Sequence, residues 1–403
     1  MIEPKGADAA WDSPREPRGA DADWTDERGT SEEGRRRIKG RPEASGKTER
    51  TGEHSFPWPY RRIATEEAFS VPEVYEALRE WAAAADPAEP DQDFWDFVCT
   101  QDGPGLHRVR RQLLDVEHER LEIMDANGVD VQLLSLTAPG VQTFPAAEGT
   151  ALARLANDRL AELIGKHPGR FAGLASVAPQ DPMAAAAEIG RAVTELKLNG
   201  VIINSHTGSE YLDEQKYWPL LEAAEALGAP IYLHPRSPAA QMAAAFRKYG
   251  LETGIWGFQA DTGLHGLRLI CGGVFDRFPR LRIILGHLGE GLPYWLYRLD
   301  DLHPVRSSYR TRPVLSLTPS EYIKRNFAIT TSGMNWAPVL RFCIEAVGAD
   351  NIMFAIAYPY QATEGAVRFL DEAEISDEDR RKIYHRNAER IFGIPDGDER
   401  GEI

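Results

Sequence analysis

From about residue 60 onward, short apolar runs alternate with longer segments whose apolar residues recur every three or four positions. A short apolar run bounded by turn residues is typical of a buried strand, and the longer period is typical of an amphipathic helix. The pattern predicts eight strands, at residues 63–67, 130–137, 171–178, 200–205, 230–234, 281–287, 326–331 and 351–358. The predicted helices between them include residues 149–167, 182–198, 217–227, 264–278 and 337–347.

This alternation of strand and helix predicts a parallel sheet with right-handed crossovers. Eight such units within residues 61–395 predict a single (β/α)8 TIM-type barrel. A doubly wound open sheet is the alternative, and it normally carries a glycine-rich phosphate loop after its first strand. The chain has Glu66-Glu67-Ala68-Phe69 at that point, which favours the barrel.

Two long segments follow the predicted carboxyl ends of strands. Residues 70–112 form a helical insertion after strand one that is rich in aromatic residues, and residues 235–263 follow strand five. Active sites of barrels lie at these strand ends, so both segments could wall a pocket. Packing or dimerisation is the equally weighted alternative for each.

The two ends of the chain have a different composition from the barrel. Residues 1–60 are rich in Gly, Asp, Glu, Arg and Pro and nearly lack aliphatic residues. Such a segment cannot bury enough apolar surface to offset the entropy lost on ordering. We expect a disordered charged tail at residues 1–60 and a short flexible tail at residues 396–403.

The charge of the chain restricts its partners. The formal net charge is −16, which disfavours nucleic acid and anionic membranes as partners because both need a basic surface. No apolar run reaches the roughly 18 residues of a membrane span. Cys99, Cys271 and Cys343 are odd in number and widely spaced, so we expect no disulfide framework and a cytoplasmic location.

Polar residues that could bind a metal stand at three predicted strand ends. Strand one ends in Glu66-Glu67, strand five in His234, and strand six in His287. A lone histidine at a strand end is more often structural than functional. A carboxylate and two imidazoles on one rim of a barrel instead favour a site for a divalent cation.

These strand ends belong to longer motifs with a shared resemblance. The chain resembles the decarboxylase branch of the amidohydrolase superfamily, including 5-carboxyvanillate decarboxylase and related hydroxybenzoate decarboxylases. The similarity extends from about residue 61 to residue 395. The motifs that carry it are Arg62-Ile63-Ala64-Thr65-Glu66-Glu67-Ala68-Phe69, Asp125-Ala126-Asn127-Gly128-Val129-Asp130, Leu136-Thr137-Ala138-Pro139-Gly140-Val141-Gln142, Val177-Ala178-Pro179-Gln180-Asp181-Pro182, Ile203-Asn204-Ser205-His206-Thr207, Gly286-His287-Leu288-Gly289-Glu290 and Leu292-Pro293-Tyr294-Trp295-Leu296-Tyr297-Arg298-Leu299-Asp300.

The resemblance implies specific roles for five residues. Glu66 and His234 would bind a divalent metal, Mn²⁺ or Zn²⁺. His287 would contact the substrate or a metal-bound water, and Glu290 would orient the ring of His287. Arg298 would bind a substrate carboxylate. The substrate would be a small hydroxylated aromatic acid, which loses carbon dioxide.

The chain departs from the family pattern at strand eight. The family has an Asp there that binds the metal and is the favoured proton donor, and this chain has Ala357. A methyl group can neither bind a cation nor donate a proton. The fold and the family expected from the other motifs are unaffected, but we expect weakened metal binding and impaired catalysis.

Four more residues are candidates for lining a substrate pocket. Asn204 and His206 end strand four, Phe258 lies in the second insertion, and Tyr358 follows the alanine of strand eight. Structural hydrogen bonding by Asn204 and His206, and a turn-forming role for Tyr358, are the alternatives.

Three functions remain open at this stage. Non-oxidative decarboxylation is favoured by the retained 292–300 motif, a lactonase-like hydrolase on the same barrel is the second, and a binding protein for aromatic acids without turnover is the third. A homodimer or homotetramer is expected because the aromatic 70–112 insertion would be an unusually large apolar surface on a monomer.

Overall fold

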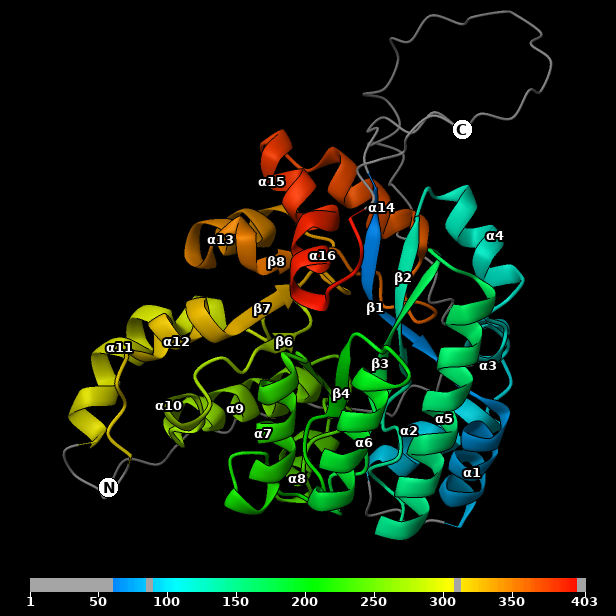
Figure 1. The fold of residues 1–403 in the computed structure, drawn as a ribbon, viewed down its shortest axis with the longest axis horizontal. Helices are drawn as coiled ribbons and strands as arrows, with labels where there is room; N and C mark the ends of the chain where they lie inside the picture. Colours follow the sequence, from blue (N-terminus) through cyan, green and yellow to red (C-terminus); the bar gives the residue numbers. More distant parts are fainter. Residues whose placement is uncertain (1–60, 85–89, 308–312, 397–403) are drawn as a thin grey trace, which may run out of the picture.

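The computed structural model describes residues 61–84, 90–307 and 313–396. The expected tail at residues 1–60 lies outside these ranges, as does the expected tail at residues 396–403 except for its first residue. Eight parallel strands follow one another in chain order around a (β/α)8 barrel (Figure 1). The strands are β1 (Ile63–Phe69), β2 (Val131–Leu136), β3 (Phe171–Ser176), β4 (Gly200–Asn204), β5 (Ile231–His234), β6 (Ile283–Leu285), β7 (Phe327–Thr330) and β8 (Ile352–Met353).

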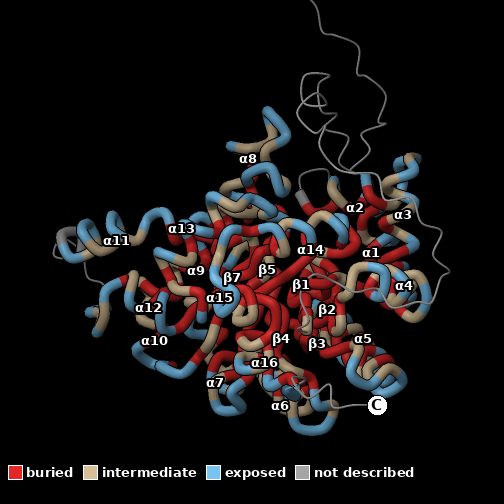
Figure 2. Tube along the Cα trace, turned by 90° about the horizontal axis from the view of Figure 1, so that it is seen from above, coloured by how far each residue is buried: buried red, intermediate tan, exposed pale blue. Residues whose placement is uncertain are grey.

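Helices connect the strands and cover the outside of the barrel (Figures 1 and 2). They are α1 (Pro72–Ala83), α2 (Pro90–Thr100), α3 (Pro104–Leu114), α4 (Glu119–Ala126), α5 (Ala146–Lys166), α6 (Pro182–Thr194), α7 (Trp218–Leu227), α8 (Ala240–Arg247), α9 (Gly257–Cys271), α10 (Val274–Arg277), α11 (Leu292–Ser307), α12 (Pro319–Asn326), α13 (Ala337–Val347), α14 (Thr363–Glu372), α15 (Asp377–Arg381) and α16 (Asn387–Phe392). Shorter helical turns are η2 (Gln215–Tyr217), η3 (Ala349–Asn351) and the π-helical η4 (Lys382–Arg386).

Two apolar layers form because successive strand residues point to opposite sides of the sheet. Every residue of β2, β3 and β4 is buried, as expected for a parallel sheet covered on both faces. One layer lies between the strands and the helices, and the smaller one lies inside the barrel. In Figure 2 the buried strands occupy the centre and exposed residues lie on the outer helices.

The helical insertion after strand one is confirmed, and it consists of α1, α2 and α3. Its central aromatic residue, Trp95, is fully buried and its indole N–H donates to the carbonyl of Ala138 at 3.0 Å. Phe97 is more exposed, at 39%. The insertion therefore buries its largest side chain against its own barrel, which removes much of the apolar surface that suggested an oligomer.

Strand β8 is joined to β1 by a seam that is not a regular ladder. The ladder pairs run from β1–β2 to β7–β8. At the seam, the N–H of Thr65 donates to the carbonyl of Phe354 at 3.0 Å, and that of Ala68 to the carbonyl of Tyr358 at 2.8 Å. The residues after Met353 are therefore held by individual hydrogen bonds to β1.

The predicted positions of all eight strands are confirmed, but strands six and eight are shorter than expected. The backbone takes positive φ values at His287 and at Ala357, which end an extended conformation. The predicted helix at 264–278 was wrong in extent. It begins earlier, at Gly257, and breaks at Gly273, where φ is +75° and a left-handed residue interrupts the helix.

The expectations on membrane spans and cysteines can be compared with the described residues. Within residues 61–396, apart from the two internal gaps, no helix is both long and apolar enough to cross a membrane. Cys99, Cys271 and Cys343 are all free thiols.

Candidate active site

The carboxylate of Glu66 is the centre of the candidate site. Glu66 is buried near the end of β1, and its Oε2 accepts hydrogen bonds from the hydroxyls of Tyr232, Ser332 and Thr330, the last at 3.2 Å. A Cβ on Gly286 would lie 2.7 Å from the same oxygen, so only glycine fits there. These contacts fix one oxygen and leave Oε1 to face the neighbouring strands.

Two imidazoles face that second oxygen. The Nε2 atoms of His234 and His287 lie 3.5 and 3.9 Å from Glu66 Oε1. The Nδ1 atom of His234 lies 2.7 Å from the carbonyl of Pro235, and that of His287 lies 2.8 Å from Glu290 Oε1. Because a carbonyl and a carboxylate accept hydrogen bonds, each Nδ1 carries the proton and each Nε2 is directed toward the carboxylate.

The pKa values of Glu66 and His287 are shifted in opposite directions. Burial alone would raise the pKa of Glu66, but the charge of His287 and the hydrogen bonds with His234 and Ser332 lower it to about 2. Burial alone would lower the pKa of His287, but Glu290 and Glu66 raise it to about 9. At neutral pH the pair is therefore a carboxylate beside an imidazolium.

The donor atoms fit a divalent metal with two protein ligands. Two ligands that each lie about 2.1 Å from one ion are about 3.5 Å apart at an angle near 110°, and Glu66 Oε1 and His234 Nε2 are separated by 3.5 Å. Across the described part of the chain, no group of three or more His, Cys, Asp or Glu side chains is arranged to hold a metal. The residues present therefore suit an open site rather than a closed structural one.

Ala357 is hydrogen-bonded to the backbone of Glu66. Its N–H donates to the backbone carbonyl of Glu66 at 3.1 Å, and its φ is +68°. The residue is half-buried. A left-handed conformation is unusual for alanine and more common for Asp and Asn. The backbone thus suits the Asp that the family resemblance implies at this position.

Asn204 and His206 lie at the end of β4 and are both buried. The N–H of Asn204 donates to Gln142 Oε1 at 2.6 Å. The ring of His206 bonds through Nε2 to the carbonyl of Ser237 at 2.9 Å and accepts the N–H of Ser209 through Nδ1 at 3.3 Å. Both ring nitrogens of His206 are thus used to hold loops, so the structural alternative accounts for its contacts.

The other predicted substrate residues are more widely distributed. Tyr358 is buried, and the guanidinium of Arg120 lies 4.3 Å from the centre of its ring. Phe258 is half-buried on α9. Arg298 is exposed on α11. It is not among the residues whose hydrogen bonds to Glu66 are described above. A substrate role for each of the three remains a prediction.

Sequence reasoning missed two contributors to the site. Tyr232 lies two residues before His234 on β5, so the two-residue period of a strand places both side chains on one face. That signal was present in the sequence. Glu67 is the second, and burial raises its pKa to about 8 despite two backbone hydrogen bonds that lower it. Its partners are remote in sequence, so no local pattern indicated them.

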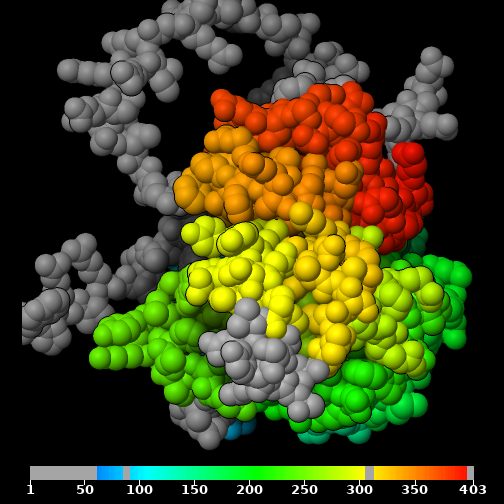
Figure 3. Space-filling model, turned by 90° about the vertical axis from the view of Figure 1, so that its left-hand side faces the viewer, coloured from blue at the N-terminus to red at the C-terminus, as the bar shows by residue number. Residues whose placement is uncertain are grey.

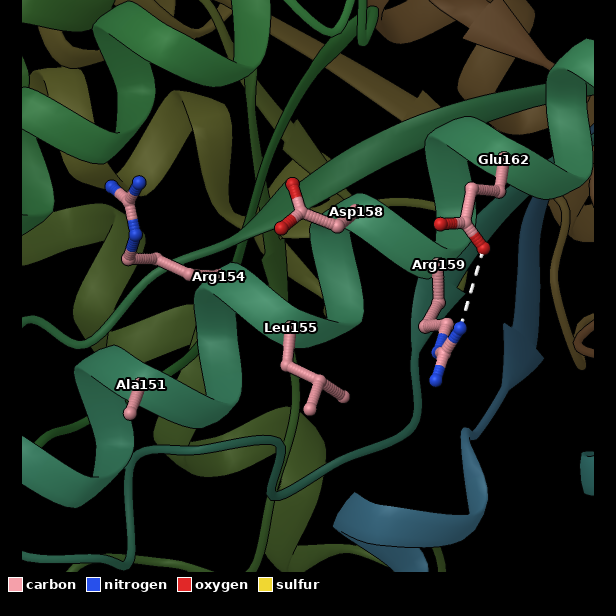
Figure 4. A pocket seen from close by; sticks show the side chains of 6 residues that line it. All are labelled: Ala151, Arg154, Leu155, Asp158, Arg159 and Glu162. Carbon is pink, nitrogen blue, oxygen red and sulfur yellow. Dashed lines mark hydrogen bonds and ion pairs between the residues drawn. The ribbon is translucent and has the colours of Figure 1, made fainter.

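A separate surface hollow lies on the outer face of α5 (Figure 4). It is lined by Ala151, Arg154, Leu155, Asp158, Arg159 and Glu162. Asp158 accepts a hydrogen bond from Arg191 at 2.6 Å, and Arg159 pairs with Glu162. These charges are matched on the helix surface.

An acid and two imidazoles at the carboxyl ends of barrel strands define a class of metal-assisted barrel enzymes. The chain belongs to the amidohydrolase family, whose sequence model matches residues 91–394. It is 38% identical over 309 residues to gamma-resorcylate decarboxylase of Polaromonas sp., covering 74% of this chain and 93% of that protein.

Solved structures of decarboxylases are similar over most of the chain. The 5-carboxyvanillate decarboxylase of Sphingomonas paucimobilis is 48% identical with a TM-score of 0.81, covering 83% of this chain and 99% of its own. The 5-carboxyvanillate decarboxylase of Novosphingobium aromaticivorans is 39% identical with a TM-score of 0.80, covering 83% of this chain and 97% of its own. That structure contains manganese and 4-hydroxy-3-methoxy-5-nitrobenzoic acid.

Proposed function

We propose that this chain is a carboxy-lyase of the amidohydrolase family that acts on a hydroxylated aromatic carboxylic acid without oxidation. The observation that carries the proposal is the convergence of Glu66, His234 and His287 on one point at the carboxyl ends of the strands. The decarboxylases of similar sequence and fold support the same chemistry. The substitution at position 357 is expected to reduce the activity of this chain.

The reaction requires one proton and releases one molecule of carbon dioxide. A proton adds to the ring carbon that bears the carboxylate, the bond between them breaks, and its electron pair restores the aromatic ring. Glu66 and His234 would hold the divalent metal, which supplies a Lewis acid and a template when bound. We propose Mn²⁺, since relatives contain manganese, with Zn²⁺ as the alternative that metal analysis distinguishes.

The residues around the metal ligands orient charge toward the substrate. Glu290 accepts the Nδ1–H of His287 at 2.8 Å and so aims Nε2 into the site. The ring of His287 would then contact an anionic substrate through Nε2. Arg298 is retained as a proposed contact for a substrate carboxylate, and Arg298→Ala would then raise KM.

Ala357 favours a second candidate function, an aromatic-acid-binding protein with little or no turnover. The methyl group leaves the metal with two protein ligands and removes the proton donor implied for the family. A positioned acid typically contributes a rate factor of about 10²–10⁴. The groups that would hold the anion, including His287, are still in place.

The variant Ala357→Asp tests both candidates. We expect it to raise bound Mn²⁺, measured by atomic emission, together with carbon dioxide release from hydroxybenzoates. The matched control is Ala357→Asn, which has a similar shape and tolerates the left-handed backbone but lacks the acid. Ordinary turnover by the unmodified chain, with no gain from Asp, would overturn the proposal. A ring-opened acid as product would indicate the hydrolase.

We also propose a homodimer or homotetramer, for a reason that differs from the sequence argument. Exposed aromatic residues gather on α11 and α13, whose yellow and orange segments lie side by side in Figure 3. Tyr294 is 73% exposed, Trp295 49% and Phe342 40%, and the Tyr294 and Trp295 rings are 5.2 Å apart. Such a patch is unusual on a monomer. A monomer mass by sedimentation at micromolar concentration would contradict this.

A reducing, cytoplasmic location remains part of the proposal. It is supported by the three free thiols, one of which, Cys343, is buried. Fractionation of cells that express the tagged chain would test it, and recovery outside the cytoplasm would contradict it.

A further inference from the structure

Three successive backbone amides in the segment after β8 are hydrogen-bonded to residues of β1. The N–H of Ile356 donates to Glu67 Oε1 at 2.9 Å, and the N–H of Tyr358 to Glu67 Oε2 at 3.1 Å. Between them, the N–H of Ala357 donates to the carbonyl of Glu66 at 3.1 Å. Each oxygen of Glu67 thus binds one of the two amides that flank position 357.

We propose that Glu67 is a positioning residue that holds the side chain of residue 357 beside Glu66 and His234. This inference rests on the proposed function, because it assigns Glu67 a purpose toward the metal site. The carboxyl oxygens of Glu67 are hydrogen-bonded to backbone amides. It acts through the backbone of its neighbours on strand eight.

The segment needs such a support because the regular ladder ends before it. Strand β8 stops at Met353, and three residues lie between Met353 and Ala357. Without a ladder, the φ of +68° at Ala357 has to be fixed by other bonds. The carboxyl group of Glu67 suits this purpose because it offers one oxygen to each of the two amides that flank residue 357.

The surroundings of Glu67 indicate that an ion pair is not the reason for its burial. Glu67 is fully buried. The nearby guanidinium of Arg120 donates instead to Gln132 Oε1 at 3.0 Å and to the carbonyls of Ala68 and Gln112, at 2.6 and 3.3 Å. Burying a carboxylate is costly unless hydrogen bonds compensate it. The hydrogen bonds recorded for Glu67 go to the two amides that flank residue 357.

A double-mutant cycle on Mn²⁺ affinity tests the proposal without an activity assay. The affinity is measured by electron paramagnetic resonance for the unmodified chain, Ala357→Asp, Glu67→Gln and the double variant. Glutamine has one acceptor oxygen, and its amide N–H₂ would face the second amide, so the turn should shift. We expect Glu67→Gln to weaken Mn²⁺ binding about 10-fold or more when Asp is at position 357, and to change it little with Ala357.

The matched control is Asn157→Leu, which removes a similar support at another strand. Asn157 Oδ1 accepts the N–H of Ser176 at the end of β3, at 2.8 Å, and Asn157 Nδ2 donates to the Ser176 carbonyl at 2.9 Å. Its loss should affect Mn²⁺ affinity equally in both backgrounds. If Glu67→Gln does not fold, Glu67→Asp replaces it, because Asp keeps both acceptors on a shorter side chain and should give the same dependence on residue 357.

The outcomes separate this inference from the proposed function. If Ala357→Asp gains no Mn²⁺, the proposed function and the positioning role are both overturned. If it gains Mn²⁺ and the change at Glu67 has the same effect in both backgrounds, or none, the positioning role alone is overturned. The positioning role is supported if the change at Glu67 weakens Mn²⁺ binding only when Asp is at position 357.

Discussion

His265 is a fully buried imidazole on α9 that the surrounding groups keep neutral. The N–H of Leu212 donates to its Nε2 at 2.9 Å, and the ring of Tyr211 packs edge-on at 5.0 Å. Burial, together with the charges of His206 and Arg268, lowers the pKa of His265 to about 3. Protonation would also remove the acceptor that Leu212 uses.

This histidine should make stability depend on pH. An unfolded chain protonates histidine near pH 6.5, whereas folded His265 does so only near pH 3. Between these values the unfolded state binds more protons, so the free energy of unfolding falls as the pH falls below about 6.5. The variant His265→Gln lacks this contribution. The unmodified chain should have the higher free energy of unfolding at pH 7. Its advantage over the variant, measured by urea denaturation, should fall by about 2 kcal/mol between pH 7 and pH 5.

Asp261 is linked to this ring through Ser205, whose Oγ lies 2.5 Å from Asp261 and 3.4 Å from His265. It is unchanged in the variant. His118→Gln, at an exposed ring on the surface, is the control and should show a constant difference over the same range. The prediction would be contradicted if the difference in free energy of unfolding between the unmodified chain and His265→Gln were also constant over this pH range.

At the residue scale, the sequence predicted the chemistry of the site better than its geometry. Glu66, His234 and His287 could be placed because each follows a recognisable apolar run. The alanine at position 357 was visible as a departure from a motif, but its φ of +68° was not. That angle depends on hydrogen bonds to Glu67, which is 289 and 291 positions from its two partners.

Among the elements, α2 is fixed to the loop after β5 by a buried ion pair. Arg236 Nε donates to Asp91 Oδ2 at 2.6 Å, and both side chains are 4% exposed. Asp91 Oδ1 also accepts the N–H of Ser237 at 3.0 Å. The first insertion is therefore anchored to the segment that directly follows His234.

Removing one charge of this pair should be costly. The variant Asp91→Asn leaves Arg236 buried without its partner, and breaking a buried pair typically costs about 3–5 kcal/mol. We expect a loss of that order in urea denaturation, and faster proteolysis within the first insertion. Glu76→Gln, which breaks an exposed pair with Arg79 on α1, is the control. A loss as small as that of the control would show that the pair contributes little.

The sequence predicted which elements exist more reliably than where they end. Periodicity located the strands because their residues are buried on both faces. The ends of β6 and β8 depend on left-handed residues, and the break at Gly273 divides one predicted helix into α9 and α10. The pairing of Asp91 with Arg236 spans 145 positions, so no local pattern could indicate it.

Over the whole molecule, the last helix closes the interior of the barrel. Ala388 and Phe392 of α16, with Ile394, are buried in the inner apolar cluster. They pack there with inward-facing strand residues such as Ile63 and Leu133. The inner layer is small, so these three side chains form a substantial part of it.

The variant Phe392→Ala should therefore destabilise the whole barrel. The side chain is 3% exposed, and replacing a buried Phe by Ala typically costs about 3–5 kcal/mol through lost burial and the cavity left behind. Urea denaturation measures the loss. Phe97→Ala, at a side chain that is 39% exposed, is the control and should cost much less. Equal losses would show that α16 does not close the core.

The seam between β1 and β8 has a consequence for how the protein is made. The hydroxyl of Thr65 bonds to the carbonyl of Phe354 across 289 positions, and α16 follows later still. A growing chain on the ribosome therefore cannot complete its barrel until nearly all of it has been synthesised. Until then β1 is an open edge strand, which can pair with other chains. Until the last segment is made, this edge favours association between unfinished chains over closure of the barrel.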